Sequence, residues 1–185
     1  LRDLISAQYI EWNRLVMKYK SPEAYINSEV RKVIEEQGTV LGQLSGKVLR
    51  KFNTPDEIAQ FLKTDKDGAF FWSGRMSNNQ GVMDIALDIA QSKGGTTLEG
   101  LLAKYNIEMP LFNPDDPVVV KIWEDVSALY ATQVSGEVKA VIGKNLRPGN
   151  VWEKIELGRL KSNSKVTKIT TIDPETMIET IIFTR

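Results

Sequence analysis

The sequence contains no cysteine and no histidine. Without cysteine the chain has no disulfide, no thiolate nucleophile and no iron–sulfur or thiolate-bound zinc site. Without histidine it cannot use Ser-His-Asp or Cys-His catalysis, histidine metal ligands or a histidine pair for RNA cleavage. Acid–base chemistry must therefore use carboxylates, lysine, tyrosine or the backbone. Small secreted domains usually depend on disulfides, so we expect this one to work inside a cell.

The chain also lacks an excess of charge of either sign and any long apolar run. Its 24 Lys and Arg balance 24 Asp and Glu, which argues against a nucleic acid or an anionic membrane as partner. No run of about 18 apolar residues exists, so we expect no membrane insertion. Apolar residues make up 42% of the 185, enough for the core of one large or two small domains. The start, Leu1-Arg2-Asp3, has neither Met nor a signal-like block, and we expect a domain cut from a longer polypeptide.

Apolar residues recur at helical spacing through much of the first 110 residues. This periodicity predicts helices over residues 4–19, 22–34, 55–62 and 82–90, and a short one opening at 96–99. Thr54 with Glu57, and Thr96 with Glu99, have the spacing of capping boxes. We therefore expect residues 1–112 to form a helical N-terminal lobe.

The second part begins at Asn113-Pro114-Asp115-Asp116-Pro117, the best candidate for a boundary. A helix over 119–130 follows, and then the pattern changes to strands. We expect strands over 137–142, 151–157, 165–172 and 177–183, the last two joined by a turn at 173–176. The sequence thus predicts an α+β fold, with a smaller C-terminal α/β lobe over 113–185 and an active-site cleft between the lobes.

Four short motifs carry residues suited to chemistry. They are Phe70-Phe71-Trp72-Ser73-Gly74-Arg75, then Thr97-Leu98-Glu99, then Trp123-Glu124-Asp125-Val126-Ser127, and finally Ile155-Glu156-Leu157-Gly158-Arg159-Leu160. In this order and context they resemble the ADP-ribosyl cyclase / NAD glycohydrolase family known from animal ectoenzymes. That family carries an aromatic-Trp-Ser segment, a Thr-Leu-Glu, a Trp-x-x-Val-Ser helix and a hydrophobic-Glu-hydrophobic-x-x-Leu segment. The resemblance covers roughly residues 68–166 and implies an ADP-ribosyl cyclase-like fold.

The resemblance also implies roles for single residues. Glu156 matches the catalytic carboxylate, and Glu99 the second acid, which influences hydrolysis against cyclisation. The implied substrate-binding residues are Trp72 and Trp123 at the nicotinamide end, Ser73 and Ser127 near the ribose and phosphates, and Arg75 and Trp152 beside them. This sequence departs from the family in a longer stretch between Trp72 and Glu99, in Gly74 before Arg75, and in having no disulfides.

Elementary chemistry agrees with these roles. The pyridinium of NAD is a cation, which an indole face attracts by roughly 1–2 kcal/mol when water is excluded. Loss of nicotinamide leaves an oxocarbenium-like ribosyl centre that a carboxylate can stabilise or trap. Nicotinamide leaves as a neutral molecule, so neither histidine nor a metal is required, and we expect no cofactor besides NAD as substrate. NADP is an alternative substrate.

Strand geometry supplies an independent reason to choose Glu156. Alternation over 151–157 places Val151, Ile155 and Leu157 on one face and Trp152, Lys154 and Glu156 on the other. That second face is a plausible cleft wall, whereas Glu153 shares the apolar face and is the alternative carboxylate.

Bacterial effector domains of the family fit the absence of cysteine. The resemblance implies a toxin, of the kind used in contact-dependent growth inhibition, that is secreted or delivered within a larger polypeptide. It would deplete NAD in the target-cell cytoplasm and be neutralised by a cognate immunity protein. Residues 1–50 could serve entry, folding or partner binding.

Two other functions remain open from the sequence. Pro114-Asp115 followed by Glu137-Val138-Lys139 matches a loose pattern of metal-dependent nucleases, whose carboxylates hold Mg²⁺. A non-catalytic binding module, with its tryptophans as core or partner anchors, is the second alternative.

Overall fold

The computed structural model describes residues 51–185. The helices predicted over 4–19 and 22–34, and the proposed roles of residues 1–50, lie outside the described residues. Among the described residues, 51–108 and 114–185 form one compact unit, to which the fold and the site described here belong.

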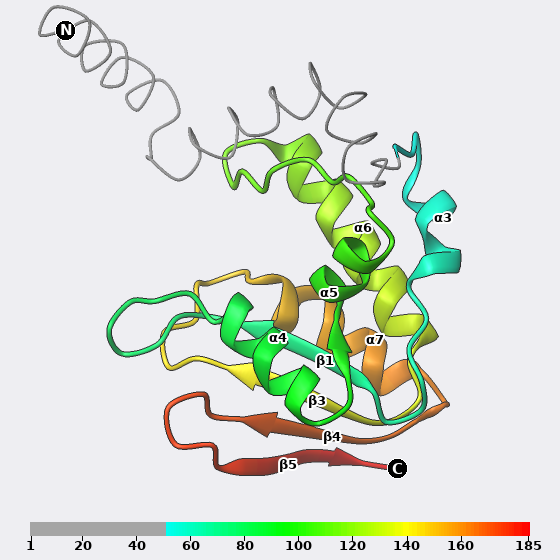
Figure 1. Ribbon diagram of the computed structural model, residues 1–185. Helices are drawn as coiled ribbons and strands as arrows, with labels where there is room; N and C mark the ends of the chain where they lie inside the picture. The colour runs from blue at the N-terminus through cyan, green and yellow to red at the C-terminus, as the bar shows by residue number, and fades with distance from the viewer. Residues whose placement is uncertain (1–50) are drawn as a thin grey trace, which may run out of the picture. The chain divides into compact units, whose positions relative to one another are not determined.

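A five-stranded sheet forms the centre of this unit (Figure 1). Its strands, in the order of the sheet, are β2 (Thr96–Thr97), β1 (Ala69–Ser73), β3 (Gly136–Ile142), β4 (Val166–Ile172) and β5 (Glu179–Thr184). The first four strands are parallel, and β5 joins the edge antiparallel to β4. Parallel strands need crossover connections, and these are supplied by helices.

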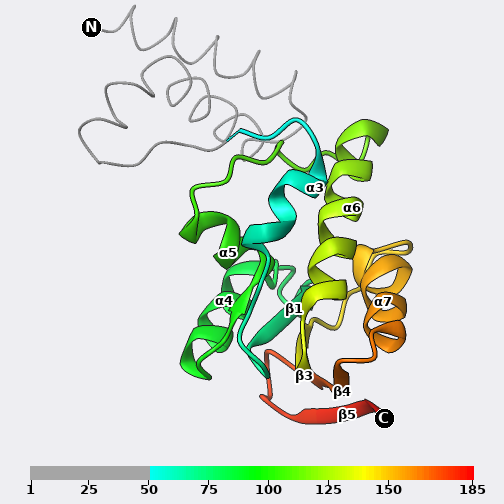
Figure 2. The ribbon, with the colours of Figure 1, turned by 90° about the vertical axis from the view of Figure 1, so that its right-hand side faces the viewer.

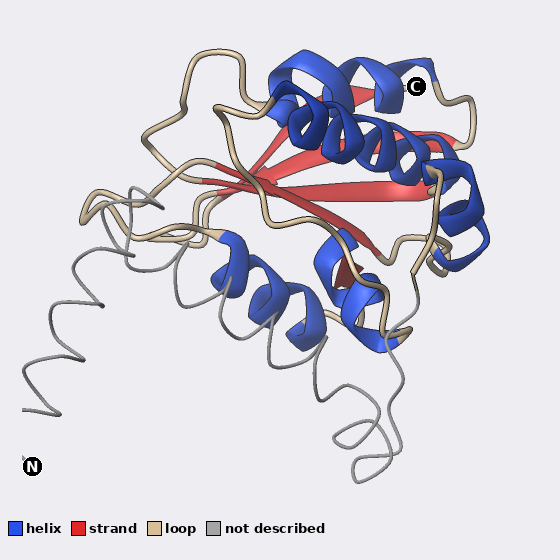
Figure 3. Ribbon diagram, turned by 90° about the horizontal axis from the view of Figure 1, so that it is seen from above, coloured by secondary structure: helices blue, strands red, loops and turns tan. Residues whose placement is uncertain are grey.

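Helices cover both faces of the sheet (Figure 3). On one face lie α4 (Met83–Ser92) and α5 (Leu98–Lys104). On the other lie α6 (Pro117–Gln133), the π-helical turn η2 (Trp152–Glu156) and α7 (Leu157–Ser162). The short helix α3 (Pro55–Ile58) packs against α6 and is followed by the 3₁₀ turn η1 (Ala59–Phe61). None of the helices in the described part is long and apolar enough to cross a membrane.

Strand β1, an interior strand of the sheet, packs on both of these layers. Phe70 joins a buried cluster with Val82 and Ala86 beside α4. Phe71 points the other way, with its ring centroid 4.7 Å from that of Tyr130 on α6 and 5.9 Å from that of Trp152 on η2. Because neighbouring strand residues face opposite sides, the core lies on both sides of β1.

Several predicted elements are confirmed. Strands β3, β4 and β5, helix α4 and helix α6 all occur where the sequence predicts them. Helix α6 begins at Pro117, and the Asp116 carboxylate caps it by accepting hydrogen bonds from the backbone N–H groups of Val118 (2.9 Å) and Val119 (3.3 Å). The helix predicted over 119–130 thus begins two residues earlier, at the Asp-Pro sequence.

The predicted capping boxes are wrong in detail. Helix α5 is capped by Thr97 rather than Thr96, since the Thr97 hydroxyl accepts from the backbone N–H of Gly100 at 3.1 Å. The Thr54 side chain caps nothing, and the Glu57 carboxylate accepts from the backbone N–H of Asn53. The helix predicted over 55–62 is correspondingly short, divided into α3 and η1.

The strand predicted over 151–157 is wrong. These residues form η2, in which the backbone N–H of Leu157 donates to the carbonyl of Trp152, five residues earlier. Trp152, Glu156 and Leu160 are buried at a spacing of four, which is a helical face. The β-branched Val151 and Ile155 favour a strand locally, and tertiary packing overrides that preference.

The described part of the predicted helical lobe also contains strands. β1 and β2 belong to the sheet that holds β3, so the described unit is a mixed α/β structure that joins residues from both sides of the predicted boundary at 112/113. Strand β1 was missed because a short strand buried on both faces has no alternating pattern.

Candidate functional site

The candidate site lies at the carboxyl ends of the parallel strands, where the direction of winding changes. From β1 the chain crosses through α4 to β2 on one side, and from the adjacent β3 it crosses through η2 and α7 to β4 on the other. The two crossovers lie on opposite faces of the sheet (Figure 2). Sheets of this kind bind ligands outside the strand ends at such a switch point. Trp72 and Ser73 are the last residues of β1.

The chain turns sharply after Ser73, at Gly74. Its φ is +84°, and a Cβ there would lie 2.9 Å from the backbone oxygen of Asn145. Glycine is therefore required at the position where the sequence departs from the family pattern.

Four of the predicted site residues converge from four different elements. Glu99 lies in the first turn of α5, and its carboxylate accepts a hydrogen bond from the Trp72 indole of β1. Glu156 ends η2, and its carboxylate accepts from the hydroxyl of Ser127 on α6. The two carboxyl groups are close enough for the charge of Glu99 to act on Glu156. The site is thus a buried acid pair in which a side chain from another element donates a hydrogen bond to each acid.

Glu156 is strongly perturbed by this environment. Its side chain is buried, with the residue only 7% exposed. Burial, followed by the negative charge of Glu99, raises the pKa of Glu156 to about 8, against the lowering effect of the Ser127 hydrogen bond. At neutral pH the carboxyl is therefore largely protonated, and a cation beside it would favour its ionised form.

Glu99 is perturbed in the same direction. Burial raises the pKa of its carboxyl, while hydrogen bonds from Trp72, its own backbone N–H and Thr97 oppose the rise. One carboxyl oxygen, Oε2, is buried with no hydrogen-bond partner among the described residues. An unsatisfied buried acceptor is costly and is a common feature of functional sites.

Trp123 and Ser73 belong to α6 and β1, the elements that also carry Ser127 and Trp72. Trp123 is half-buried on α6, one turn before Ser127 and on the same side of the helix. Ser73 is buried at the end of β1, and its hydroxyl donates to Oδ1 of Asn150 at 3.3 Å. That bond joins the end of β1 to the beginning of η2.

Trp152 and Arg75 are not brought to the acid pair by any contact that the structure shows. Trp152 is 4% exposed and packs against Phe71 in the core. Arg75 is exposed, and its Nη1 donates to the backbone oxygen of Asn79 at 2.9 Å. Their substrate-binding roles stay predictions.

Sequence reasoning missed two residues, Tyr130 and Asn150. Tyr130 is fully buried on α6 beside both acids, and its place on the apolar side of the helix does not distinguish it from the core residues there. Asn150 is 5% exposed and caps η2, since its Oδ1 accepts from the backbone N–H of Glu153. Asn two residues before an apolar aromatic could have indicated a helix start, had a helix been predicted there.

The residues of the nuclease pattern lie apart. Asp115 precedes α6 and Glu137 follows it, so a helix of 17 residues, about 25 Å long, lies between them in the chain. The Glu137 carboxylate instead pairs with Lys168 (2.8 Å) and accepts from the hydroxyl of Thr170. Within residues 51–185 no three acids are grouped to hold a metal ion. The nuclease interpretation is therefore not supported by the arrangement of its own residues.

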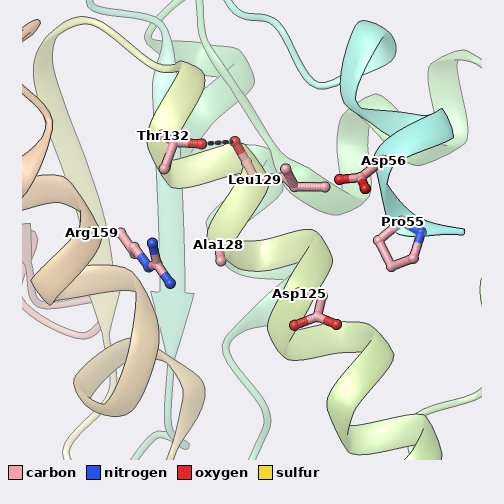
Figure 4. Close-up of a pocket in the computed structure, with 7 residues that line it drawn as sticks. All are labelled: Pro55, Asp56, Asp125, Ala128, Leu129, Thr132 and Arg159. Atoms are coloured by element: carbon pink, nitrogen blue, oxygen red, sulfur yellow. Dashed lines mark hydrogen bonds between the residues drawn. The ribbon is translucent and has the colours of Figure 1, made fainter.

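A separate cavity of about 280 Å³ lies between α3, α6 and α7 (Figure 4). Arg159 lines one side, and Asp56 and Asp125 line the other. None of the acid-pair residues lines it. Drug-sized ligands occupy pockets of about 300–1,000 Å³, so this cavity is too small for a dinucleotide.

Comparison with known proteins gives similarities to solved structures alone. No family model and no curated protein matches the chain. It is similar to an Aplysia cyclase in complex with the substrate NGD and the product cGDPR, with 26% identity over 59% of this chain and 49% of that one, at a TM-score of 0.42. The chain is similar to the same degree to an ADP-ribosyl cyclase complexed with N1-cIDPR, with 25% identity over 59% of this chain and 50% of that one, at a TM-score of 0.43. It is also similar to a glutamate-to-alanine mutant of an ADP-ribosyl cyclase, with 27% identity over 59% and 50% of the two chains, at a TM-score of 0.42. The chain spans about half the length of these structures, and with TM-scores below 0.5 the case for a function rests on the residues of the site.

Proposed function

We propose that this chain is an enzyme that cleaves the nicotinamide–ribose bond of NAD and releases nicotinamide and ADP-ribose. The observation that supports this proposal most is the buried pair of Glu156 and Glu99. The Trp72 indole donates a hydrogen bond to Glu99, and the Ser127 hydroxyl donates one to Glu156. The chain has no histidine or cysteine, so a reaction driven by carboxylates is the chemistry it can supply.

The cationic substrate complements the state of the acid pair. A buried carboxyl with a pKa of about 8 gains stability in its ionised form when a pyridinium approaches. The Trp72 indole, half-buried beside Glu99, offers an aromatic surface for the same cation. In this proposal Trp123 contributes a second aromatic face from α6.

The bond between ribose C1′ and the pyridinium nitrogen then breaks, and its electron pair stays on nicotinamide, which leaves neutral. The Glu156 carboxylate stabilises the positive charge left on the ribosyl centre. Water adds to C1′, and its proton passes to a carboxylate of the pair, which completes hydrolysis. Capture of the same cation by the adenine base of the substrate would give cyclic ADP-ribose as a minor product. Glu99 would influence the ratio of hydrolysis to cyclisation.

The biological setting is a further part of the proposal and rests on the sequence resemblance alone. We propose a bacterial toxin domain, delivered as part of a larger polypeptide, that depletes NAD in the cytoplasm of a target cell. A cognate immunity protein would bind and neutralise it. NADP is proposed as a second substrate on the same chemical grounds.

The test is to incubate the purified chain with NAD and identify the products by chromatography. The proposal expects nicotinamide and ADP-ribose in equal amounts, with cyclic ADP-ribose as a minor fraction. Absence of nicotinamide at micromolar protein would contradict it and favour the non-catalytic binding module.

A further inference from the structure

Tyr130 places a hydroxyl group in the core beside the acid pair. The residue is fully buried on α6, and its ring lies 4.7 Å from that of Phe71. Its hydroxyl lies 3.2 Å from the backbone oxygen of Phe70 on β1 and 3.2 Å from that of Thr96 on β2. One O–H donor is thus directed at two neighbouring strands, at residues one register position apart, since Phe70 pairs with Thr97 and not with Thr96.

Each partner of Tyr130 is a short step along the chain from a residue of the site. Phe70 precedes Trp72 by two residues on the same strand, and Thr96 precedes Glu99 by three. Ser127, which donates to Glu156, lies one helical turn before Tyr130 on the same side of α6. The hydroxyl therefore joins three elements of the site. β1 carries Trp72, β2 leads directly into the helix of Glu99, and α6 carries Ser127.

Packing alone does not account for the hydroxyl. A phenylalanine would fill the same space against Phe71 without burying a polar group. Burial of a hydroxyl is unfavourable unless the hydroxyl makes a hydrogen bond. Burial raises the pKa of this phenol well above its ordinary value; the hydrogen bond to Phe70 opposes the rise, and the negative charges of Glu99 and Glu156 add to it. Tyr130 thus remains a neutral donor at every pH at which the acids titrate.

We infer that Tyr130 is a positioning residue that fixes the separation of Glu99 and Glu156 by holding β2 against α6. This inference rests on the proposed function, although the geometry it describes can be measured without turnover. Tyr130 touches no reacting atom; it acts through the elements that carry the two acids.

The first test is Tyr130→Phe, with Tyr105→Phe as the matched control. Tyr105 is half-buried at the C-terminal end of α5, whereas Glu99 lies in the first turn, and the Tyr105 ring stacks on Phe61 with centroids 5.3 Å apart. Because displacement of about an ångström is costly in catalysis, kcat for NAD cleavage should fall roughly tenfold or more in Tyr130→Phe, with KM within about twofold. Tyr105→Phe should leave both constants unchanged. Equal kcat in Tyr130→Phe and wild type would overturn the inference.

The second test follows the Glu156 carboxyl by ¹³C NMR as pH is varied, without substrate. Burial and the charge of Glu99 both raise its pKa, so separation of β2 from α6 in Tyr130→Phe should lower it. An unchanged Glu156 pKa would overturn the inference even if activity fell. If the wild type cleaves no NAD, the proposed function fails, and this titration still decides the role of Tyr130.

A third measurement needs no substitution at Tyr130 and guards against a variant that does not fold. Ultraviolet titration of the wild-type chain should show one tyrosine that ionises well above the others. Glu156→Gln removes one of the charges that raise the Tyr130 pKa, so this late step should move to lower pH. Ionisation of all tyrosines in one ordinary step would overturn the placement of Tyr130 beside the acids.

Discussion

Glu156 and Glu153 lie three residues apart on one helical turn and have opposite surroundings. Glu156 is buried beside Glu99, whereas Glu153 is exposed and its Oε2 accepts from the Asn150 amide at 2.8 Å. The family resemblance selected Glu156, and strand alternation was offered as a second reason, which is wrong here because these residues form a helical turn. That second reason still agrees with the burial because spacing of two and spacing of four both place Glu156 with Trp152.

The first prediction concerns the pH dependence of NAD cleavage. Glu156 must be ionised to stabilise the ribosyl cation, so kcat/KM should rise with pH through about 8, the pKa of this carboxyl in the free enzyme. In Glu99→Gln the neighbouring charge is absent, and the rise should move to lower pH. The measurement is kcat/KM in buffers of constant ionic strength. An identical midpoint in the two proteins would contradict electrostatic coupling of the acids.

The second prediction concerns stability. The pKa of Glu156 is raised in the folded chain, so the stability that its protonated form contributes is fully present below its ordinary 4.5 and is lost as pH rises through about 8. Glu156→Gln carries no charge to bury. Its melting temperature should exceed that of wild type by roughly 3 °C or more at about pH 8.5, and the difference should shrink toward about pH 4.5. Calorimetry at both pH values measures it, and a pH-independent difference would contradict the shift.

At the scale of elements, η2 is the part of the site that the sequence predicted least well. Val151, Ile155 and Leu157 alternate as in a strand, while the buried set of Trp152, Glu156 and Leu160 has helical spacing. Both periods fit a stretch this short, and the packing of Trp152 on Phe71 decides between them. Helix α6 and strands β3 to β5 were predictable because they are long or carry clear caps and turns.

The third prediction concerns the start of η2. The Asn150 side chain caps this turn, accepts from the Ser73 hydroxyl and donates to Glu153. Asn150→Ala removes the cap and the link to β1, so it should lower the free energy of unfolding by about 1–2 kcal/mol and reduce NAD cleavage. Asn150→Ser retains a capping oxygen without placing a second carboxylate beside Glu153, and it should lose less stability. Urea unfolding of both variants measures this, and equal losses would contradict a capping role.

At the scale of the whole described unit, the site depends on a sheet that joins distant segments. β1 and β3 are neighbours although more than sixty residues separate them, as in the register pair Phe71 and Ala140. The sequence motifs predicted the convergence of Trp72, Glu99, Ser127 and Glu156 by resemblance. Composition and periodicity could not predict it, because strand order in a parallel sheet is not encoded locally.

The fourth prediction concerns metal ions. Asp115 and Glu137 lie at opposite ends of α6, so neither should take part in NAD cleavage. Asp115→Asn should retain wild-type nicotinamide release, and EDTA should leave that release unchanged. Loss of activity in EDTA that Mg²⁺ restores would contradict a reaction driven by carboxylates alone.

The central claim is that Glu156 is the carboxylate that supports cleavage of the nicotinamide–ribose bond. Its most direct test is kcat for nicotinamide release by wild type, Glu156→Gln and the matched control Glu153→Gln, all in EDTA. Removal of a group that stabilises the transition state costs about 10²–10³-fold or more, which is expected for Glu156→Gln, whereas Glu153→Gln should keep near wild-type activity. Wild-type turnover that survives in Glu156→Gln and is lost in Glu153→Gln would contradict the account.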